Sequence, residues 1–171
     1  MRIARAGSMH LLLFLVALTP LAPSCSRPSP GTFPYDAGVV DRQDSPATLV
    51  PLRGHPVVFV AYAASMPDCR KRIGHLVALS DAYPSAGIRF VAFDVNRAAA
   101  DKFAEAVPEY RGNVLFLKER SDEVSRALKI GITPTTFLVS ADGRIRDRIE
   151  SVHDWDSPDF RQRVDALVRG R

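Results

Sequence analysis

Continuous apolar runs alternate with a stretch of helical periodicity in the first half of the chain. Val57 to Ala63 and Ile88 to Val95 are almost wholly apolar, which is typical of strands covered on both faces. Between them, residues 68–83 place apolar side chains at helical spacing: Ile73, Leu76, Val77 and Leu79. Asn96 to about Val107 is a second predicted helix because of its alanine content. The predicted order is strand, helix, strand, helix, and it implies a buried parallel sheet.

The second half of the chain has shorter elements and a hairpin signal. Val114 to Leu117 is a short apolar segment, and Ser121 to Lys129 is a predicted helix with a Ser-Asp-Glu start. Thr135 to Ser140 is a predicted strand. Because Asp142-Gly143 is a strong turn signal, Arg144 to Ser151 is expected to return antiparallel to that strand.

A last helix is predicted after Ser157-Pro158-Asp159, which combines a side-chain cap, a proline at the first position and an early acid. Its predicted buried face consists of Phe160, Val164, Leu167 and Val168. Trp155 is expected to pack near this helix as a loop residue; if exposed, it would be a partner contact. Together the elements predict an α/β domain whose mixed sheet of four to five strands is flanked by helices on both faces.

The N-terminus has the pattern of an export signal. Arg2 and Arg5 precede the apolar run Leu11 to Leu18, which is too short to span a bilayer. Residues 1–24 are therefore predicted to be a cleaved signal peptide that leaves Cys25 at the new N-terminus. Two routes to that cleavage stay open: small residues at 22–24 suit a general signal peptidase, and the segment LAPSC resembles the end of a bacterial lipoprotein signal, whose cysteine receives lipid. Cys25 could also be an incidental residue of a floppy segment.

Residues 25–46 are predicted to be a tether, because they contain four prolines with Ser, Gly and Asp between them and offer only a short extended piece at Thr32 to Tyr35. The folded domain is predicted over residues 47–171. It would open with a short strand at Thr48 to Leu52 and a turn at Arg53 to Pro56.

The net charge, the cysteines and the histidines give little information about partners, disulfides or metal sites. Arg2 and Arg5 of the predicted leader supply half of the formal charge of +4, so neither a nucleic acid nor a charged membrane surface is indicated as a partner. The two cysteines, Cys25 and Cys69, suggest a disulfide only weakly, since a lipidated Cys25 would leave Cys69 alone. His55, His75 and His153 have no metal-site spacing.

Two segments carry a family resemblance. The first apolar run ends in Tyr62-Ala63 and is followed by Ser65-Met66-Pro67-Asp68-Cys69-Arg70; farther on the chain reads GITPTTFLV over residues 131–139 and then DGRI. From about Phe33 to Val168 the chain resembles the thioredoxin-like superfamily, and within it the exported, membrane-tethered TlpA-type thiol-disulfide oxidoreductases. In that family Trp-Cys-x-x-Cys-Arg follows the aromatic-alanine pair, so Met66 stands in place of the first cysteine and Ser65 in place of the tryptophan.

The resemblance implies a thioredoxin fold in which Pro134 follows a cis peptide bond. It also implies that Thr133, Pro134 and Pro67 line a substrate groove beside the redox site. The implied partners are protein thiols or disulfides, and no cofactor is implied. The GITP segment has one residue fewer before its proline than the family pattern. Peroxiredoxins would require proline at Tyr62 and threonine at Met66, so that comparison is set aside.

A dithiol site needs an exposed thiolate that attacks a disulfide and a second thiol that resolves the product. A thioether cannot form a disulfide, so Met66 removes the ordinary cycle, and Cys69 stands at the resolving position. Burial would make Cys69 less reactive, whereas the basic residues 70–72 would favour its thiolate. Three interpretations stay open. Cys69 could be an inherited core cysteine in a binding or scaffold domain, or a single thiol that forms mixed disulfides or pairs with a free Cys25. It could also hold Cu(I) together with Met66, with or without His75 as a further ligand.

The sequence thus predicts an exported protein related to thiol-disulfide oxidoreductases, with a degenerate site and doubtful dithiol activity. It would lie in the periplasm, tethered to a membrane by lipidated Cys25 or otherwise soluble there. It would act through the single thiol Cys69, or hold a partner polypeptide in the groove without chemistry. No resident metal is expected outside the Cu(I) alternative.

Overall fold

The computed structural model describes residues 31–84, 87–96, 113–150 and 154–170, without the side chain of Arg70. The predicted signal peptide, Cys25, His153 and nearly all of the predicted helix from Asn96 to Val107 lie outside the described residues. No helix in the described part of the chain is both long and apolar enough to cross a membrane.

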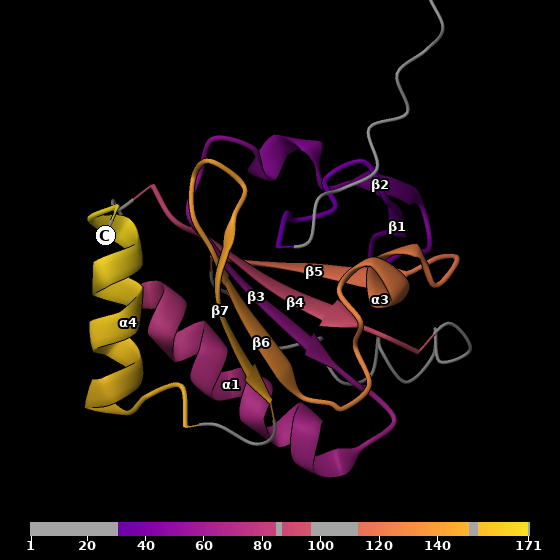
Figure 1. Ribbon diagram of the computed structural model, residues 1–171. Coiled ribbons are helices and arrows are strands. Elements are labelled where there is room, and N and C mark those ends of the chain that lie inside the picture. The colour runs from indigo at the N-terminus through magenta and orange to yellow at the C-terminus, as the bar shows by residue number, and fades with distance from the viewer. Residues whose placement is uncertain (1–30, 85–86, 97–112, 151–153, 171) are drawn as a thin grey trace, which may run out of the picture.

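The described strands form one mixed sheet of seven strands in the order β2-β1-β5-β4-β3-β6-β7 (Figure 1). Neighbours β3, β4 and β5 are parallel, and the other neighbours are antiparallel. The strands are β1 (Gly38–Val40), β2 (Pro46–Thr48), β3 (Val57–Tyr62), β4 (Arg89–Asp94), β5 (Val114–Glu119), β6 (Thr135–Val139) and β7 (Ile145–Glu150). The central strands and the hairpin agree with the prediction, but the sheet is wider than the predicted four to five strands.

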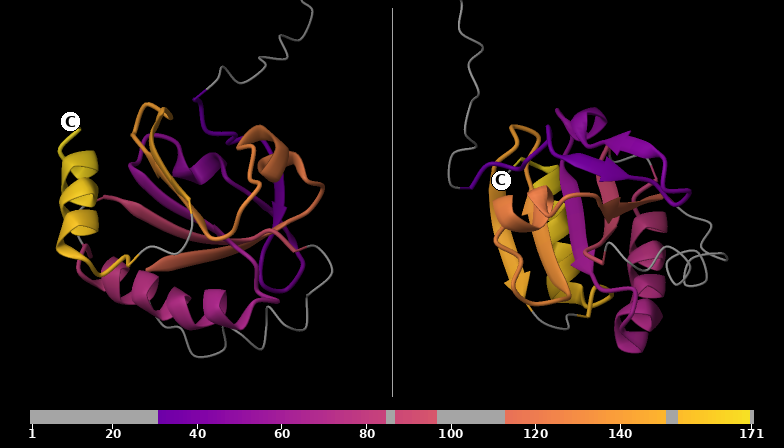
Figure 2. Two further views of the ribbon diagram at one scale, coloured as in Figure 1. Left: turned by 60° about the horizontal axis from the view of Figure 1, so that its bottom comes forward. Right: turned by 90° about the vertical axis from the view of Figure 1, so that its right-hand side faces the viewer.

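The sheet has helices on both faces, as expected. Helices α1 (Pro67–Asp81) and α4 (Pro158–Val168) lie next to each other on one face, and α3 (Glu123–Ala127) covers the other (Figure 2). The Ser157 hydroxyl caps α4 by accepting a hydrogen bond from the Phe160 N–H at 3.3 Å, which confirms the predicted start of this helix. The predicted strand from Thr48 to Leu52 is wrong, since a 3-10 helix, η1 (Val50–Leu52), follows β2. Pro51 lacks the N–H group that a strand would use there.

Alternating side chains of the central strands divide the core into two halves. Val58, Val60 and Tyr62 of β3 face α1 and α4, whereas Val57, Phe59 and Ala61 face α3 and the N-terminal segment. All six side chains are buried, which explains why the strand lacks a polar position. The Phe59 ring lies 5.0–6.3 Å from three other aromatic rings, those of Phe33, Phe93 and Phe137.

Residues 31–46, which the sequence analysis assigned to a tether, belong to the packed domain. Thr32 bridges to Arg144 beside the hairpin turn, and the Phe33 N–H donates to the Gly143 carbonyl at 2.9 Å. Gly143 has a φ of +82°, and a Cβ there would lie 3.0 Å from the Tyr35 ring. Pro34 begins a turn between buried residues, since its carbonyl accepts from the Ala37 N–H at 3.2 Å, whereas Pro46 lies in β2. Strand β1 adds to the sheet by pairing with β5.

Trp155 is a core residue with 1% of its surface exposed, which rules out the alternative of an exposed partner contact. Its indole N–H donates to the Thr136 hydroxyl in β6 at 3.0 Å, and both groups are buried. This hydrogen bond fixes the segment before α4 to β6, between β3 and β7.

Replacing Thr136 by valine should destabilise the domain by about 1–3 kcal/mol, because the buried indole N–H would lose its acceptor. Trp155 is the single tryptophan of the chain, so its fluorescence reports urea unfolding directly. Thr136→Ser keeps the hydroxyl and is the matched control, with a smaller expected loss. Equal stability of Thr136→Val and the unmodified protein would contradict the proposed role of the bond.

Candidate functional site

The site lies at the carboxyl end of β3, where the chain turns into α1. The Met66 N–H donates to the Ala63 carbonyl at 3.0 Å and closes this turn. Met66 is the N-cap residue of α1 with an extended backbone, and Pro67 opens the helix. Cys69 therefore follows one turn inside the helix, at the place expected from the sequence.

The two sulfur-bearing residues differ in exposure. Met66 is 46% exposed, whereas Cys69 is buried with 3% of its surface exposed and is a free cysteine. Met66 thus occupies the accessible position, but a thioether cannot be deprotonated or form a disulfide. The thiol that could do so is buried in the core on the side of the sheet that α1 and α4 cover.

A second segment approaches the site from the start of β6. The Thr133-Pro134 peptide bond is cis, as the family resemblance implied. The Thr133 hydroxyl donates to the Met66 sulfur at 3.8 Å, so residues 67 positions apart in sequence meet here. Pro134 is buried, while Ile132 is 50% exposed. We call Met66, Pro67, Ile132 and Thr133 the site surface.

A buried carboxylate holds the turn before α1. The Asp94 Oδ1 atom accepts hydrogen bonds from the N–H groups of Ala64 and Asn96, each at 3.0 Å, and Asp94 has no exposed surface. The Asn96 side-chain amide donates to the Ser65 hydroxyl at 3.0 Å. Four residues from two segments thus fix the backbone that presents Met66.

Asp94 and Asn96 are site residues that were not predicted, although the sequence carries a signal for Asp94. Asp94 ends the apolar run of β4, and the carboxyl ends of neighbouring parallel strands meet at the same edge of a sheet. In the register, Asp94 lies opposite Tyr62, directly before the turn. A polar residue at the end of a buried strand next to β3 was therefore a candidate.

Burial raises the pKa of Asp94 above its usual value. The hydrogen bonds from Ala64 and Asn96 and the charge of Lys118 lower this pKa without cancelling the effect of burial. Lys118 lies opposite Asp94 in β5 and is itself paired with Asp44. The folded protein therefore binds a proton at Asp94 more readily than the unfolded chain does.

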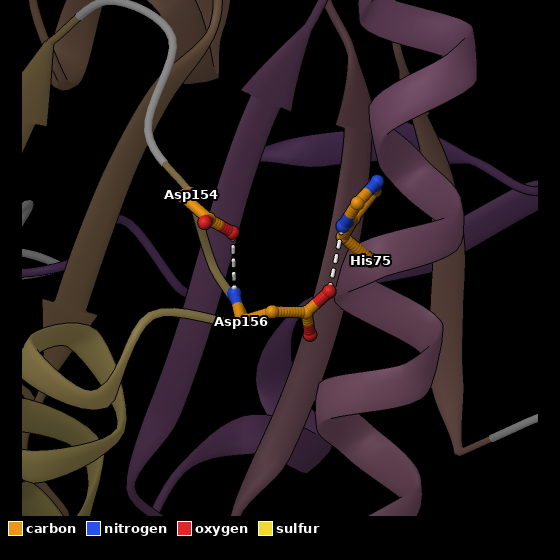
Figure 3. Close-up of side chains that lie close together, drawn as sticks. All are labelled: His75, Asp154 and Asp156. Atoms are coloured by element: carbon orange, nitrogen blue, oxygen red, sulfur yellow. Dashed lines mark hydrogen bonds and ion pairs between the residues drawn. The ribbon is translucent and has the colours of Figure 1, made fainter.

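His75 makes its contacts away from the two sulfurs. Its Nδ1 atom lies 2.6 Å from the Asp156 Oδ2 atom, and the Asp154 carboxylate accepts from the Asp156 N–H at 3.0 Å (Figure 3). These three residues offer possible metal-ligand atoms within 4.8 Å of one another. The Arg161 guanidinium lies 3.7 Å from the other oxygen of Asp156 and would oppose a cation. The arrangement joins α1 to the segment before α4.

The same contacts bear on the Cu(I) alternative. His75 lies six residues after Cys69, which corresponds to about 9 Å along a helix axis. With Met66 exposed, Cys69 buried and His75 directed to Asp156, the described contacts do not bring the three side chains together.

Asp94→Asn should flatten part of the pH dependence of stability. Because the folded pKa of Asp94 is raised, its contribution to stability is fully present below the unfolded pKa of about 4 and is lost as pH rises through the folded pKa. The stability of the unmodified protein minus that of Asp94→Asn should therefore fall with rising pH, by no more than about 1.4 kcal/mol per pH unit for one proton. Urea unfolding of both proteins between pH 4 and about 8 measures this difference. A difference that rises with pH would show that the pKa is lowered instead.

Several solved structures share the fold. A thiol:disulfide interchange protein of the thioredoxin family from Chlorobium tepidum is 22% identical, with a TM-score of 0.65 over 85% of this chain and 99% of that one. The thioredoxin domain of a thiol-disulfide oxidoreductase from Bacteroides vulgatus is 19% identical, with a TM-score of 0.64 over 81% and 96%. A secreted disulfide oxidoreductase from Mycobacterium tuberculosis is 18% identical, with a TM-score of 0.63 over 80% and 97%.

No curated protein matches the chain. Its family is shown by a match over residues 31–148, which include β1 through most of β7 and both segments of the site. The fold, the cis proline and the position of Met66 and Cys69 are consistent with this match. The chain belongs to the AhpC/TSA family, a thioredoxin-like family, and its structural neighbours are thiol-disulfide oxidoreductases.

Proposed function

We propose that the protein is an exported thioredoxin-fold protein that binds an extended segment of another polypeptide at the site surface, without the ordinary dithiol cycle. The leader pattern over residues 1–24 and the secreted M. tuberculosis protein among the matches support export. The resemblance to the TlpA-type proteins supports a periplasmic location, with lipidated Cys25 as the anchor.

The observation that carries the proposal is the contrast between the two sulfurs. Met66 is 46% exposed at the position where an attacking thiolate would lie, and Cys69 is 3% exposed. An incoming disulfide would meet a thioether that cannot attack it, while the thiol of Cys69 is buried in the core. Tyr62 and Met66 also depart from the peroxiredoxin pattern, so peroxidase chemistry at this position is not proposed.

The site surface has the features that an extended peptide requires. Among the described residues, none hydrogen-bonds to the N–H or C=O of Thr133, which precedes the first paired residue of β6. A partner strand could pair with these groups, as in recognition by strand addition. Ile132 precedes Thr133 in the chain, and the Met66 sulfur accepts from the Thr133 hydroxyl. Both Ile132 and Met66 supply exposed apolar area for partner side chains.

The second candidate function is a one-cysteine route through Cys69, in which this thiol forms a mixed disulfide with a partner or a small thiol. The structural neighbours named as thiol-disulfide oxidoreductases favour it. It requires the first turn of α1 to open, because the Cys69 side chain is buried.

Oxidised glutathione separates the two functions. If Cys69 is a buried core residue, the folded mature protein should remain without an adduct, and one glutathione should attach at Cys69 only after urea unfolding. Mass spectrometry of the intact protein measures the adduct. Met66→Cys is the matched positive control and should restore insulin-reducing activity, since it returns the attacking thiol to the exposed position. Rapid attachment at Cys69 in the folded protein would favour the one-cysteine route.

Photo-cross-linking tests polypeptide binding. A photoreactive amino acid in place of Ile132 should give a several-fold higher cross-linking yield with a panel of extended peptides than one in place of Val50. Val50 is the matched control because it is 45% exposed but belongs to η1, at the other end of β3 from the site. Cys69→Ser should leave the yield from Ile132 unchanged. Equal yields at the two positions would refute binding at the site surface, and loss of yield in Cys69→Ser would favour the thiol route.

A further inference from the structure

Met66 is the one methionine of the sequence that follows the predicted leader. The chain contains three methionines, and the other two, Met1 and Met9, lie in the predicted leader. In the described residues Met66 is 46% exposed, whereas the Cys69 sulfur is covered. A small oxidant in solvent therefore meets the Met66 thioether before it meets the thiol.

The Met66 sulfur already has a hydrogen-bond donor directed at it. The Thr133 hydroxyl donates to it at 3.8 Å, and a thioether is only a weak acceptor. Met66 also stands at the N-cap of α1, where none of the described side chains accepts from the first-turn N–H groups. An oxygen atom on the sulfur would be a stronger acceptor for the same hydroxyl, with the helix N–H groups as further donors.

We propose that Met66 is an oxidation site whose sulfoxide is held by Thr133 and changes the site surface from apolar to polar. The thioether lone pair attacks one oxygen of hydrogen peroxide, an S–O bond forms and the O–O bond breaks. The sulfur is oxidised by two electrons, and the leaving hydroxide takes the proton of the transferred hydroxyl group, which gives water and the neutral sulfoxide. A methionine sulfoxide reductase, which draws two electrons from thiols, would reverse the change. The effect on a bound polypeptide rests on the proposed function, whereas the modification itself does not.

The first measurement concerns the modification alone. Mature protein is treated with hydrogen peroxide and mapped by peptide mass spectrometry, and its melting temperature is compared with that of the untreated protein. One added oxygen at Met66 and a rise of about 2–4 °C are expected, because the sulfoxide oxygen gains hydrogen bonds that the sulfur lacks. The rise should vanish in Thr133→Val, which keeps the side-chain shape and removes the hydroxyl. Met66→Leu, which cannot be oxidised, should show no shift.

The second measurement concerns binding. Cross-linking from position 132 should fall several-fold after oxidation, and Met66→Gln, which places a carbonyl oxygen on a side chain of similar length, should show the same loss without peroxide.

A melting temperature that falls or stays unchanged on oxidation, or a rise that persists in Thr133→Val, would overturn the oxidation site. If the melting temperature rises in a Thr133-dependent way but cross-linking is unchanged, oxidation of Met66 does not regulate binding, and the proposed function remains intact. Failure of cross-linking even before oxidation would count against the proposed function. The melting temperatures would still test whether Thr133 holds the Met66 sulfoxide.

Discussion

The Asp94 carboxylate sets the geometry of the site. Because β3 and β4 are parallel neighbours, Asp94 lies opposite Tyr62, and its Oδ1 atom accepts from the Ala64 N–H across the strands. A buried carboxylate is unfavourable unless hydrogen bonds compensate for its lost hydration, and here two backbone N–H groups do so in part. This contact joins Ala64, which precedes Met66 by two positions, to Asp94 in the neighbouring strand, and it does not involve residue 66. The turn into α1 can therefore keep its form whichever residue follows it.

Exposure and redox competence, which a dithiol site combines in one residue, belong to different residues in this chain. Met66 has the exposed position without a thiol, and Cys69 has the thiol without exposure. The cis Thr133-Pro134 bond and the contact from Thr133 to Met66 are nevertheless present. In the proposed function, these are the parts of the site that would position a partner chain. They are present although Met66 replaces the attacking thiol, and this combination favours binding over exchange.

The local patterns of the sequence predicted the central strands, α1, α4 and the hairpin. The strands are continuous apolar runs, α1 has a periodic apolar face, α4 has a cap, and the hairpin has a turn signal. The cis proline came from the family resemblance, since no local pattern distinguishes it. Residues 31–46 were assigned to a tether because their prolines outweighed the apolar residues between them, yet Phe33 and Val39 fill the core. Contacts such as Asp94 with Ala64 and His75 with Asp156 join distant segments. They depend on strand register and helix position, which the local secondary-structure propensities of the residues do not determine.

Helix α1 has a first turn with unused donors. In a dithiol site the thiolate interacts with the positive end of the helix, and the charge and the N–H groups satisfy each other. The Met66 side chain has no charge and no oxygen, and among the described residues no other side chain caps the helix. Within the described part of the chain, the first-turn N–H groups and the Thr133 backbone therefore have no acceptor or donor, and in the proposed function an extended polypeptide would supply partners for them. A sulfoxide oxygen on Met66 would occupy part of the same donor set, so a single atom added at residue 66 would compete directly with a bound chain.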